Sequence, residues 1–211
     1  MAIQAKESPR RGSEARLRRE DFLIYPWPAM RLFVGIGLEP QAAQDLERML
    51  EPLAASARDL RCSEPESWHV TLLFLGAATD EQAACLVEKL GGIQAARVPV
   101  QIAGLGFFER AGAFWAGVEL TAELLALQQK VTAATRACGF VPEDRAYNPH
   151  ITLARAKGRR GGRALAPMKA AVEHARIRLN AEFVAEAFLL YESLPGPGGS
   201  RYKVRGRFRL G

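Results

Sequence analysis

Hydrophobic and polar positions follow two different periods along the chain from residue 30 onwards. Short stretches with strand character alternate with stretches in which apolar residues recur at helical spacing. The predicted strands of the first half cover residues 31–38, 68–76 and 98–107, and the predicted helices cover 40–53 and 80–91. Pro40 favours the first turn of a helix, Asp80 is the expected N-cap of the next, and Gly91 is expected to end it. The first half therefore predicts strand, helix, strand, helix, strand.

The same order recurs in the second half. Strands are predicted at 113–120, 150–156 and 183–191, a helix follows Thr121, and a weaker helix near Leu165 is interrupted by Pro167. Ala113 follows Arg31 by 82 positions and His150 follows His69 by 81. This shared offset predicts a duplicated α+β fold with two pseudo-symmetric lobes, each an antiparallel sheet with helices packed on its outer face, and the site cleft between the lobes. Chance alternation is the competing explanation.

The residues before the first predicted strand differ from the rest. They mix basic and acidic side chains and have one apolar cluster, at 22–25. We expect residues 1–29 to form a flexible extension, and Met30 is a candidate native start. The folded domain is expected at 30–211, with lobe one at about 30–110, lobe two at about 111–190, and a closing hairpin strand at 200–211.

Composition indicates which cellular compartment and which kinds of partner to expect. Hydrophobic residues make up 48% and charged residues 25% of the chain, and no apolar run approaches the length of a bilayer span, which excludes a membrane protein. The formal charge of +6 favours polyanionic partners. Cys62, Cys85 and Cys138 are odd in number and far apart, so we expect neither a disulfide framework nor a cysteine-based metal site, and a reducing cytoplasm.

Two of the three histidines share one context, His-Val-Thr-Leu at 69–72 and His-Ile-Thr-Leu at 150–153. Side chains alternate faces along a strand, so each His lies on the same face as its Thr, opposite the apolar pair. Imidazole can give or accept a proton near neutrality, and hydroxyls can bind phosphate oxygens. The two motifs together therefore supply what phosphodiester hydrolysis needs without a metal. A structural histidine in each strand is the alternative, which the matched contexts disfavour.

Two basic stretches accompany the motifs. Lys157, Arg159, Arg160 and Arg163 follow the second motif among three glycines, and this predicts a mobile basic loop that either follows a nucleic-acid backbone or is simply solvated. Basic side chains also occupy every second position from 201 to 209, which predicts a strand with one basic face. Protection of a sheet edge is the favoured interpretation of that strand.

Aromatic residues near the motifs are expected to lie mainly in the core. Phe74 and Trp68 share strand parity with Val70, which places them on the apolar face. Four more aromatic residues flank a predicted turn at 110–112, and an exposed member could stack a terminal base. These four are Phe107, Phe108, Phe114 and Trp115.

On the paired motifs the chain resembles the 2H phosphoesterase superfamily, specifically its RNA 2',3'-cyclic phosphodiesterase (2'-5' RNA ligase-like) family. The resemblance extends to 30–34, 114–118, 148–155 and 193–210. It implies metal-independent hydrolysis of a terminal 2',3'-cyclic phosphate on RNA to a 2'-phosphomonoester, with reverse 2'-5' joining of RNA ends as a side reaction. The expected partner is RNA with a 2',3'-cyclic phosphate end, and no cofactor or metal is expected.

The resemblance also assigns roles. It makes His69 the proton donor and His150 the proton acceptor, which the residues alone do not distinguish, and it places Thr71, Thr152 and Arg155 against the phosphate. Further RNA contacts are expected from Lys157, Arg159 and Arg160, in a cytoplasmic monomer. Two alternatives stay open: a cyclic phosphodiesterase for a small nucleotide, such as ADP-ribose cyclic phosphate or a 2'-5' oligoadenylate, and a non-catalytic module that binds RNA ends.

Overall fold

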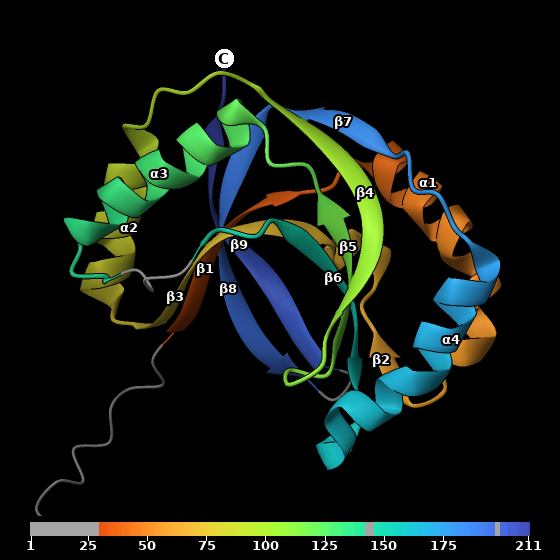
Figure 1. Ribbon diagram of the computed structural model, residues 1–211. Coiled ribbons are helices and arrows are strands. Elements are labelled where there is room, and N and C mark those ends of the chain that lie inside the picture. Colours follow the sequence, from red (N-terminus) through yellow and green to blue (C-terminus); the bar gives the residue numbers. More distant parts are fainter. Residues whose placement is uncertain (1–29, 142–145, 197–198) are drawn as a thin grey trace, which may run out of the picture.

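A curled antiparallel sheet forms the centre of the computed structural model, which describes residues 30–141, 146–196 and 199–211 (Figure 1). Its described strands follow the order β7-β4-β5-β6-β3-β1-β8-β9, with β2 beside β6. The strands are β1 (Met30–Gly37), β2 (Leu60–Cys62), β3 (His69–Ala78), β4 (Val98–Phe108), β5 (Ala113–Val118), β6 (His150–Ala156), β7 (Glu182–Ala185), β8 (Ala187–Gly196) and β9 (Gly199–Arg209). The predicted extension 1–29 lies outside the described residues.

Helices lie in two groups on either side of this sheet. The α-helices are α1 (Pro40–Leu50), α2 (Asp80–Gly91), α3 (Ala122–Arg136) and α4 (Ala166–Ala175), and the 3-10 helices are η2 (Glu51–Ser56), η3 (Pro65–Ser67) and η4 (Gly158–Leu165). Helices α2 and α3 pack together on one side, and α1 and α4 lie with η2 on the other (Figure 1). Each group therefore joins one helix from each half of the sequence.

Pseudo-symmetry of the strands confirms the predicted two-lobed α+β fold. Strand β1 pairs with β3 and β8, and β5 pairs in the same way with β6 and β4. The middle strands of the two repeats, β3 and β6, meet at Val70 and Ile151. Strand β4 thus sits beside β5 and β8 beside β1, so each half of the sequence gives one strand to the other half of the sheet.

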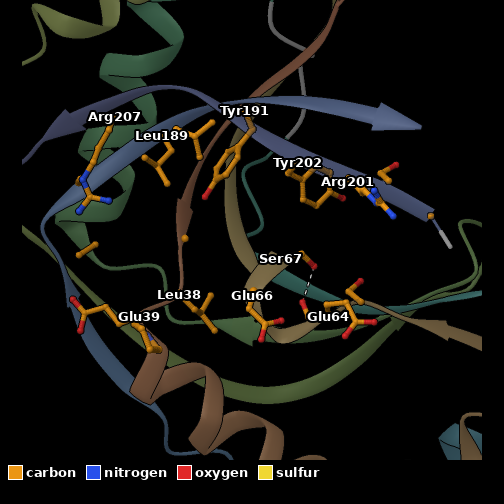
Figure 2. Close-up of a pocket in the computed structure, with 18 of the residues that line it drawn as sticks. Leu38, Glu39, Glu64, Glu66, Ser67, Leu189, Tyr191, Arg201, Tyr202 and Arg207 are labelled. Carbon is orange, nitrogen blue, oxygen red and sulfur yellow. Dashed lines mark hydrogen bonds between the residues drawn. The ribbon is translucent and has the colours of Figure 1, made fainter. Parts of the chain in front are cut away.

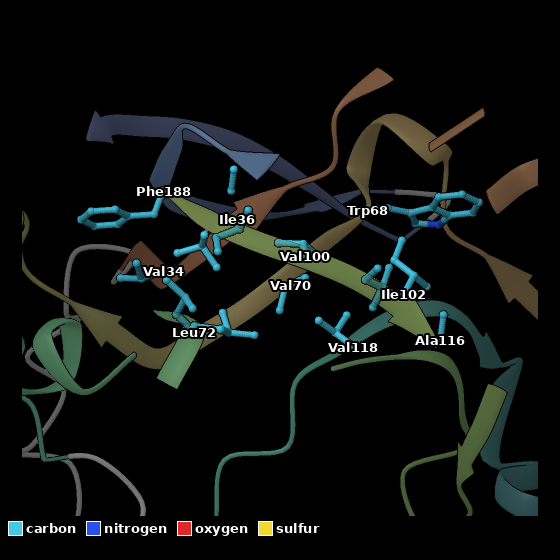
Figure 3. Packing of buried hydrophobic residues seen from close by; sticks show 14 of the residues in the cluster. Val34, Ile36, Trp68, Val70, Leu72, Val100, Ile102, Ala116, Val118 and Phe188 are labelled. Carbon is cyan, nitrogen blue, oxygen red and sulfur yellow. The ribbon is translucent and has the colours of Figure 1, made fainter. Parts of the chain in front are cut away.

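Apolar side chains from both halves form one continuous core. Val34 and Ile36 on β1, Val70 on β3 and Val100 on β4 are all at most 1% exposed (Figure 3). Trp68 is also buried, as its strand parity predicted. Each buried apolar side chain stabilises the fold by about 25 cal/mol per Å² of apolar surface removed from water. The close packing of this core makes the sheet a rigid support for the groups on its opposite face.

The expectation that the cysteines form no disulfide is wrong for one pair. Cys85 on α2 is bonded to Cys138, which lies just beyond α3, with Cα atoms 5.8 Å apart. The two are 53 positions apart in sequence, and the packing of α2 against α3 brings them together. Cys62 is free and exposed.

Helix ends differ in detail from the predictions. Thr79, not Asp80, caps α2, because its hydroxyl accepts from the Gln82 N–H while the Gln82 side chain accepts from the Thr79 N–H. Thr121 caps α3 as predicted. Pro167 does not interrupt a helix, because α4 begins at Ala166 and a proline fits the first turn.

Two further predictions need correction. The single strand expected at 183–191 is two strands, β7 and β8, which are separated by Glu186. Strand β7 pairs with β4, and β8 pairs with β1. The basic stretch after the second motif is not an open loop, because residues 158–165 form η4, whose last residues Ala164 and Leu165 are buried in the core. That apolar anchor holds the segment against the sheet.

Candidate active site

The two histidine motifs meet where β3 pairs with β6. Val70 lies opposite Ile151 in antiparallel register, and both side chains are fully buried on the core face. Their neighbours therefore point to the other face, where each histidine lies opposite the threonine of the other motif. The histidines occupy one diagonal of this group of four, and diagonal neighbours on paired strands lie about 7–8 Å apart.

Both imidazoles are oriented by the same backbone hydrogen bond. His69 Nδ1 lies 2.7 Å from the carbonyl oxygen of Ser67, and His150 Nδ1 lies 2.8 Å from that of Asn148. A carbonyl oxygen only accepts, so each Nδ1 carries the hydrogen and donates it. The tautomer is thereby set, and Nε2 is the nitrogen that gains or loses a proton in each ring.

Aromatic rings enclose each imidazole, and the enclosure is also repeated. The His69 ring lies 4.7 Å from Phe33 and 5.0 Å, edge-on, from Tyr202 between ring centroids. The His150 ring lies 4.9 Å, edge-on, from Phe108 and 6.0 Å from Trp115. Trp115 follows Phe33 by 82 positions, so the offset of the lobes holds for these rings. The rings restrict both imidazoles, and those around His69 also shield it from water.

Burial sets the charge of His69. Desolvation lowers its pKa to about 4, the Ser67 carbonyl opposes this, and the nearby charges of His150 and Arg155 lower the pKa further. His69 is therefore neutral at pH 7 when the site holds no ligand. A bound phosphate anion would favour the imidazolium and raise this pKa.

A β-bulge in β6 turns Arg155 towards the motifs. Trp115 pairs with Thr152 but Phe114 pairs with Ala154, so Leu153 is an extra residue in β6. The extra residue inverts the alternation of faces. Ala154 is then buried, and Arg155 is exposed on the face of the histidines. Its planar guanidinium offers paired donors that match phosphate oxygens.

The expectation that Phe74 lies in the core is wrong, because an equivalent bulge occurs in β3. Gly35 pairs with Thr71 but Val34 pairs with Leu73, so Leu72 is the extra residue. Phe74 consequently points away from the core and is 56% exposed. It precedes Arg155 by 81 positions, so superposing the two repeats would have placed it in the site from sequence alone.

A cavity of about 700 Å³ lies over this face of the sheet. It is lined by Thr71, Phe74, His150, Thr152 and Arg155, together with Phe107 and Phe108 from the end of β4. A larger neighbouring cavity of about 990 Å³ is lined by Ser67, Tyr191 and Tyr202 (Figure 2). These three residues contact His69. Arg155 lines both cavities and so marks where they meet.

The remaining predicted RNA contacts lie outside both cavities or outside the described residues. The Lys157 ammonium donates to the carbonyl oxygen of Arg58, at 2.7 Å, and does not line either cavity. The side chains of Arg159 and Arg160 lie outside the described residues. Tyr147 was not predicted to contribute, and its hydroxyl donates to the Thr71 carbonyl oxygen, which ties the segment before β6 to β3.

The described ranges hold neither a metal-binding cluster of side chains nor a membrane-spanning helix. Over the described ranges, no three or more His, Cys, Asp and Glu side chains gather in a way that could hold a metal ion. Within those ranges no helix has the length and apolar character needed to cross a bilayer.

Comparison with known proteins places this site in a family. A model of the family described as "LigT like Phosphoesterase" matches residues 36–115 and 118–202. The chain belongs to the LigT-like phosphoesterases. Both histidine motifs, both bulges and Arg155 fall within the matched residues.

Several relatives of this LigT-like phosphoesterase are described as RNA 2',3'-cyclic phosphodiesterases. One from Aeropyrum pernix is 31% identical over 161 residues, which cover 71% of this chain and 92% of the relative. One from Archaeoglobus fulgidus is 30% identical over 131 residues, covering 61% and 73%. The fold matches apo LigT of E. coli with a TM-score of 0.71 at 22% identity, covering 87% of this chain and 99% of that one.

Proposed function

We propose that this phosphoesterase hydrolyses the 2',3'-cyclic phosphate at the end of an RNA to a 2'-phosphomonoester. The observation that carries the proposal is the group of two histidines and two threonines formed by β3 and β6, with Arg155 beside it. Relatives described as RNA 2',3'-cyclic phosphodiesterases support the choice of substrate.

In the proposed reaction His150 Nε2 takes a proton from water as the water oxygen attacks phosphorus. The bond between phosphorus and O3' breaks, and His69 Nε2 gives its proton to O3', which leaves the phosphate on O2'. Thr71, Thr152 and Arg155 hold the non-bridging oxygens, where negative charge builds up. A 5'-hydroxyl in place of water would give the reverse 2'-5' joining of RNA ends.

The low pKa of His69 adds a requirement to this mechanism. A proton donor must be protonated, and burial holds free His69 neutral at pH 7. The bound cyclic phosphate carries one negative charge, which stabilises the imidazolium next to it. Substrate binding would therefore raise the pKa of His69, so that the imidazole takes up from solvent the proton that it later donates.

The decisive experiment incubates the protein and EDTA with a short RNA that ends in a 2',3'-cyclic phosphate. The wild type should form a 2'-phosphate that phosphatase removes, and His69→Ala and His150→Ala should each be slower by at least about 10²-fold. His174→Ala is the matched control, because His174 is exposed on α4 and should leave the rate unchanged.

Other results would contradict the mechanism. Full loss of activity with EDTA, restored by one divalent metal, would overturn the metal-free scheme. A kcat that stays flat over roughly pH 5–9 would overturn the acid and base roles, because one imidazole must be protonated while the other is neutral.

We also propose that the protein acts as a monomer in the cytoplasm, where RNA ends are its substrate. The proposed location rests on the RNA substrate alone, because the Cys85–Cys138 disulfide contradicts the argument from unpaired cysteines. Light scattering at the concentration of the activity assay should give the mass of one chain, and a dimer mass would contradict this.

A further inference from the structure

The 700 Å³ cavity over His150, Thr71 and Thr152 is called the catalytic cleft, and the larger cavity continues it on the side of His69. It lies between the start of α1 and η3 on one wall and strands β8 and β9 on the other (Figure 2). Tyr202, whose ring contacts His69, and Arg155, which lines both cavities, form the boundary. A ligand whose end occupies the catalytic cleft can therefore extend into a further 990 Å³.

Guanidinium groups line this cavity without protein partners. Among the described residues, the side chains of Arg61, Arg201 and Arg207 make no hydrogen bond or ion pair. Other arginines near the same strands are paired, as Arg97 is with Glu186 at 2.8 Å. Positive charge that no acidic side chain compensates attracts an anion that enters the cavity.

A bulge in β9 delivers one of these arginines. Leu190 pairs with Gly206 and Tyr191 with Val204, so Arg205 is the extra residue. Arg207 then joins Val204 on the cavity wall, while Arg205 turns away to Glu192 and Met30. The predicted single basic face of this strand is therefore wrong, because the bulge divides it.

The opposite wall has the opposite charge. Glu39, Glu64 and Glu66 line it, and Figure 2 shows their carboxylates across the cavity from Arg201 and Arg207. Phosphate groups would be repelled from that wall and attracted to β9. The charges thus define one orientation for an anionic chain.

We propose that this cavity is a second phosphate subsite, which binds the phosphodiester backbone of an RNA strand next to its reacting end. The inference rests on the proposed function, and adds the place where the strand next to the reacting end is bound. A volume of about 990 Å³ accommodates a nucleotide. Arg201 and Arg207 lie six positions apart on β9, and each offers paired donors to a phosphate of that backbone. A cyclic mononucleotide has only one phosphate. That phosphate occupies the catalytic cleft, so none is left for the second cavity.

The test compares two substrates, 2',3'-cyclic AMP and a short RNA with a 2',3'-cyclic phosphate end. The double variant Arg201→Gln and Arg207→Gln should lower kcat/KM on the RNA by about tenfold or more and change it on cyclic AMP by less than about twofold. The double variant Lys203→Gln and Arg209→Gln is the matched control, because it also removes two positive charges from β9 and neither residue lines the cavity. Equal losses on both substrates, or none on either, would overturn the subsite.

Failure of the subsite and failure of the proposed function give different results. If the wild type opens cyclic AMP and the RNA with equal kcat/KM, the subsite is overturned and the function stands. If it opens neither, the function is wrong, and binding of RNA that ends in a 2'-phosphate tests the subsite alone. The slope of log affinity against log salt should then fall by about one for each arginine removed, and an unchanged slope would overturn it.

Discussion

Phe74 is more than half exposed in the 700 Å³ cavity of the proposed site, where a ligand could cover its ring. Aromatic rings that line a nucleic-acid site stack on bases, and such a contact contributes about 1–3 kcal/mol. The ring also lies on the same face as Thr71, which the proposed mechanism places against the phosphate. We therefore expect Phe74 to bind the terminal base.

Replacing Phe74 by Leu should raise KM for the cyclic-ended RNA by roughly tenfold and change kcat less, because stacking binds the base without touching the reacting atoms. Steady-state kinetics measure this directly. Val87→Ala on the outer face of α2 is the control, since it shortens another exposed apolar side chain. A KM equal to that of the wild type would remove Phe74 from the site.

At the scale of elements, neighbouring strands determine how the rings beside His150 are held. Gly106 on β4 pairs with Trp115 on β5, and a Cβ at Gly106 would lie only 2.2 Å from the indole. The indole therefore lies directly over this glycine. Any side chain at position 106 would push the ring from its place beside His150.

We expect Gly106→Ala to lower kcat by at least about tenfold, because small displacements of catalytic groups are costly to rate. The protein should remain folded, which circular dichroism would verify. Gly91→Ala at the end of α2 serves as the control, since its Cβ would meet its nearest atom at an ordinary 4.0 Å. Wild-type kcat in Gly106→Ala would show that Trp115 does not position the imidazole.

For the whole molecule, burial of His69 links stability to pH. Its pKa is about 4 in the folded protein and 6.5 when unperturbed. Between these values the unfolded chain takes up a proton that the folded chain does not. The free energy of unfolding contributed by this group is thus constant above pH 6.5 and falls as pH falls towards 4, by about 3 kcal/mol in all.

Urea denaturation at several pH values tests this link. The wild type should lose more stability between about pH 6.5 and 4 than His69→Gln, which has no imidazole to protonate at this position. Other ionisable groups contribute equally to both curves and cancel in the difference. Parallel curves for the two proteins would contradict the low pKa.

The local sequence pattern by itself determined where the main strands and helices form and which residues carry most of the proposed site. The alternation of apolar and polar residues predicts β1, β3 and β6, and Thr121 predicts the start of α3, since these signals depend on near neighbours in the chain. The two histidine motifs and their 81-position offset predict a paired site, because residues in equivalent positions of a repeat become equivalent in space.

Tertiary structure decided which side chains join that site. Along an uninterrupted strand, the alternation of faces predicts Phe74 in the core. The same alternation predicts Arg207 on one face together with all the remaining basic residues of β9. Bulges arise from pairing with a partner strand, here β1 and β8, and each inverts the alternation beyond it. The exchange of β4 and β8 between the lobes has the same origin, because strand pairing depends on residues far apart in sequence.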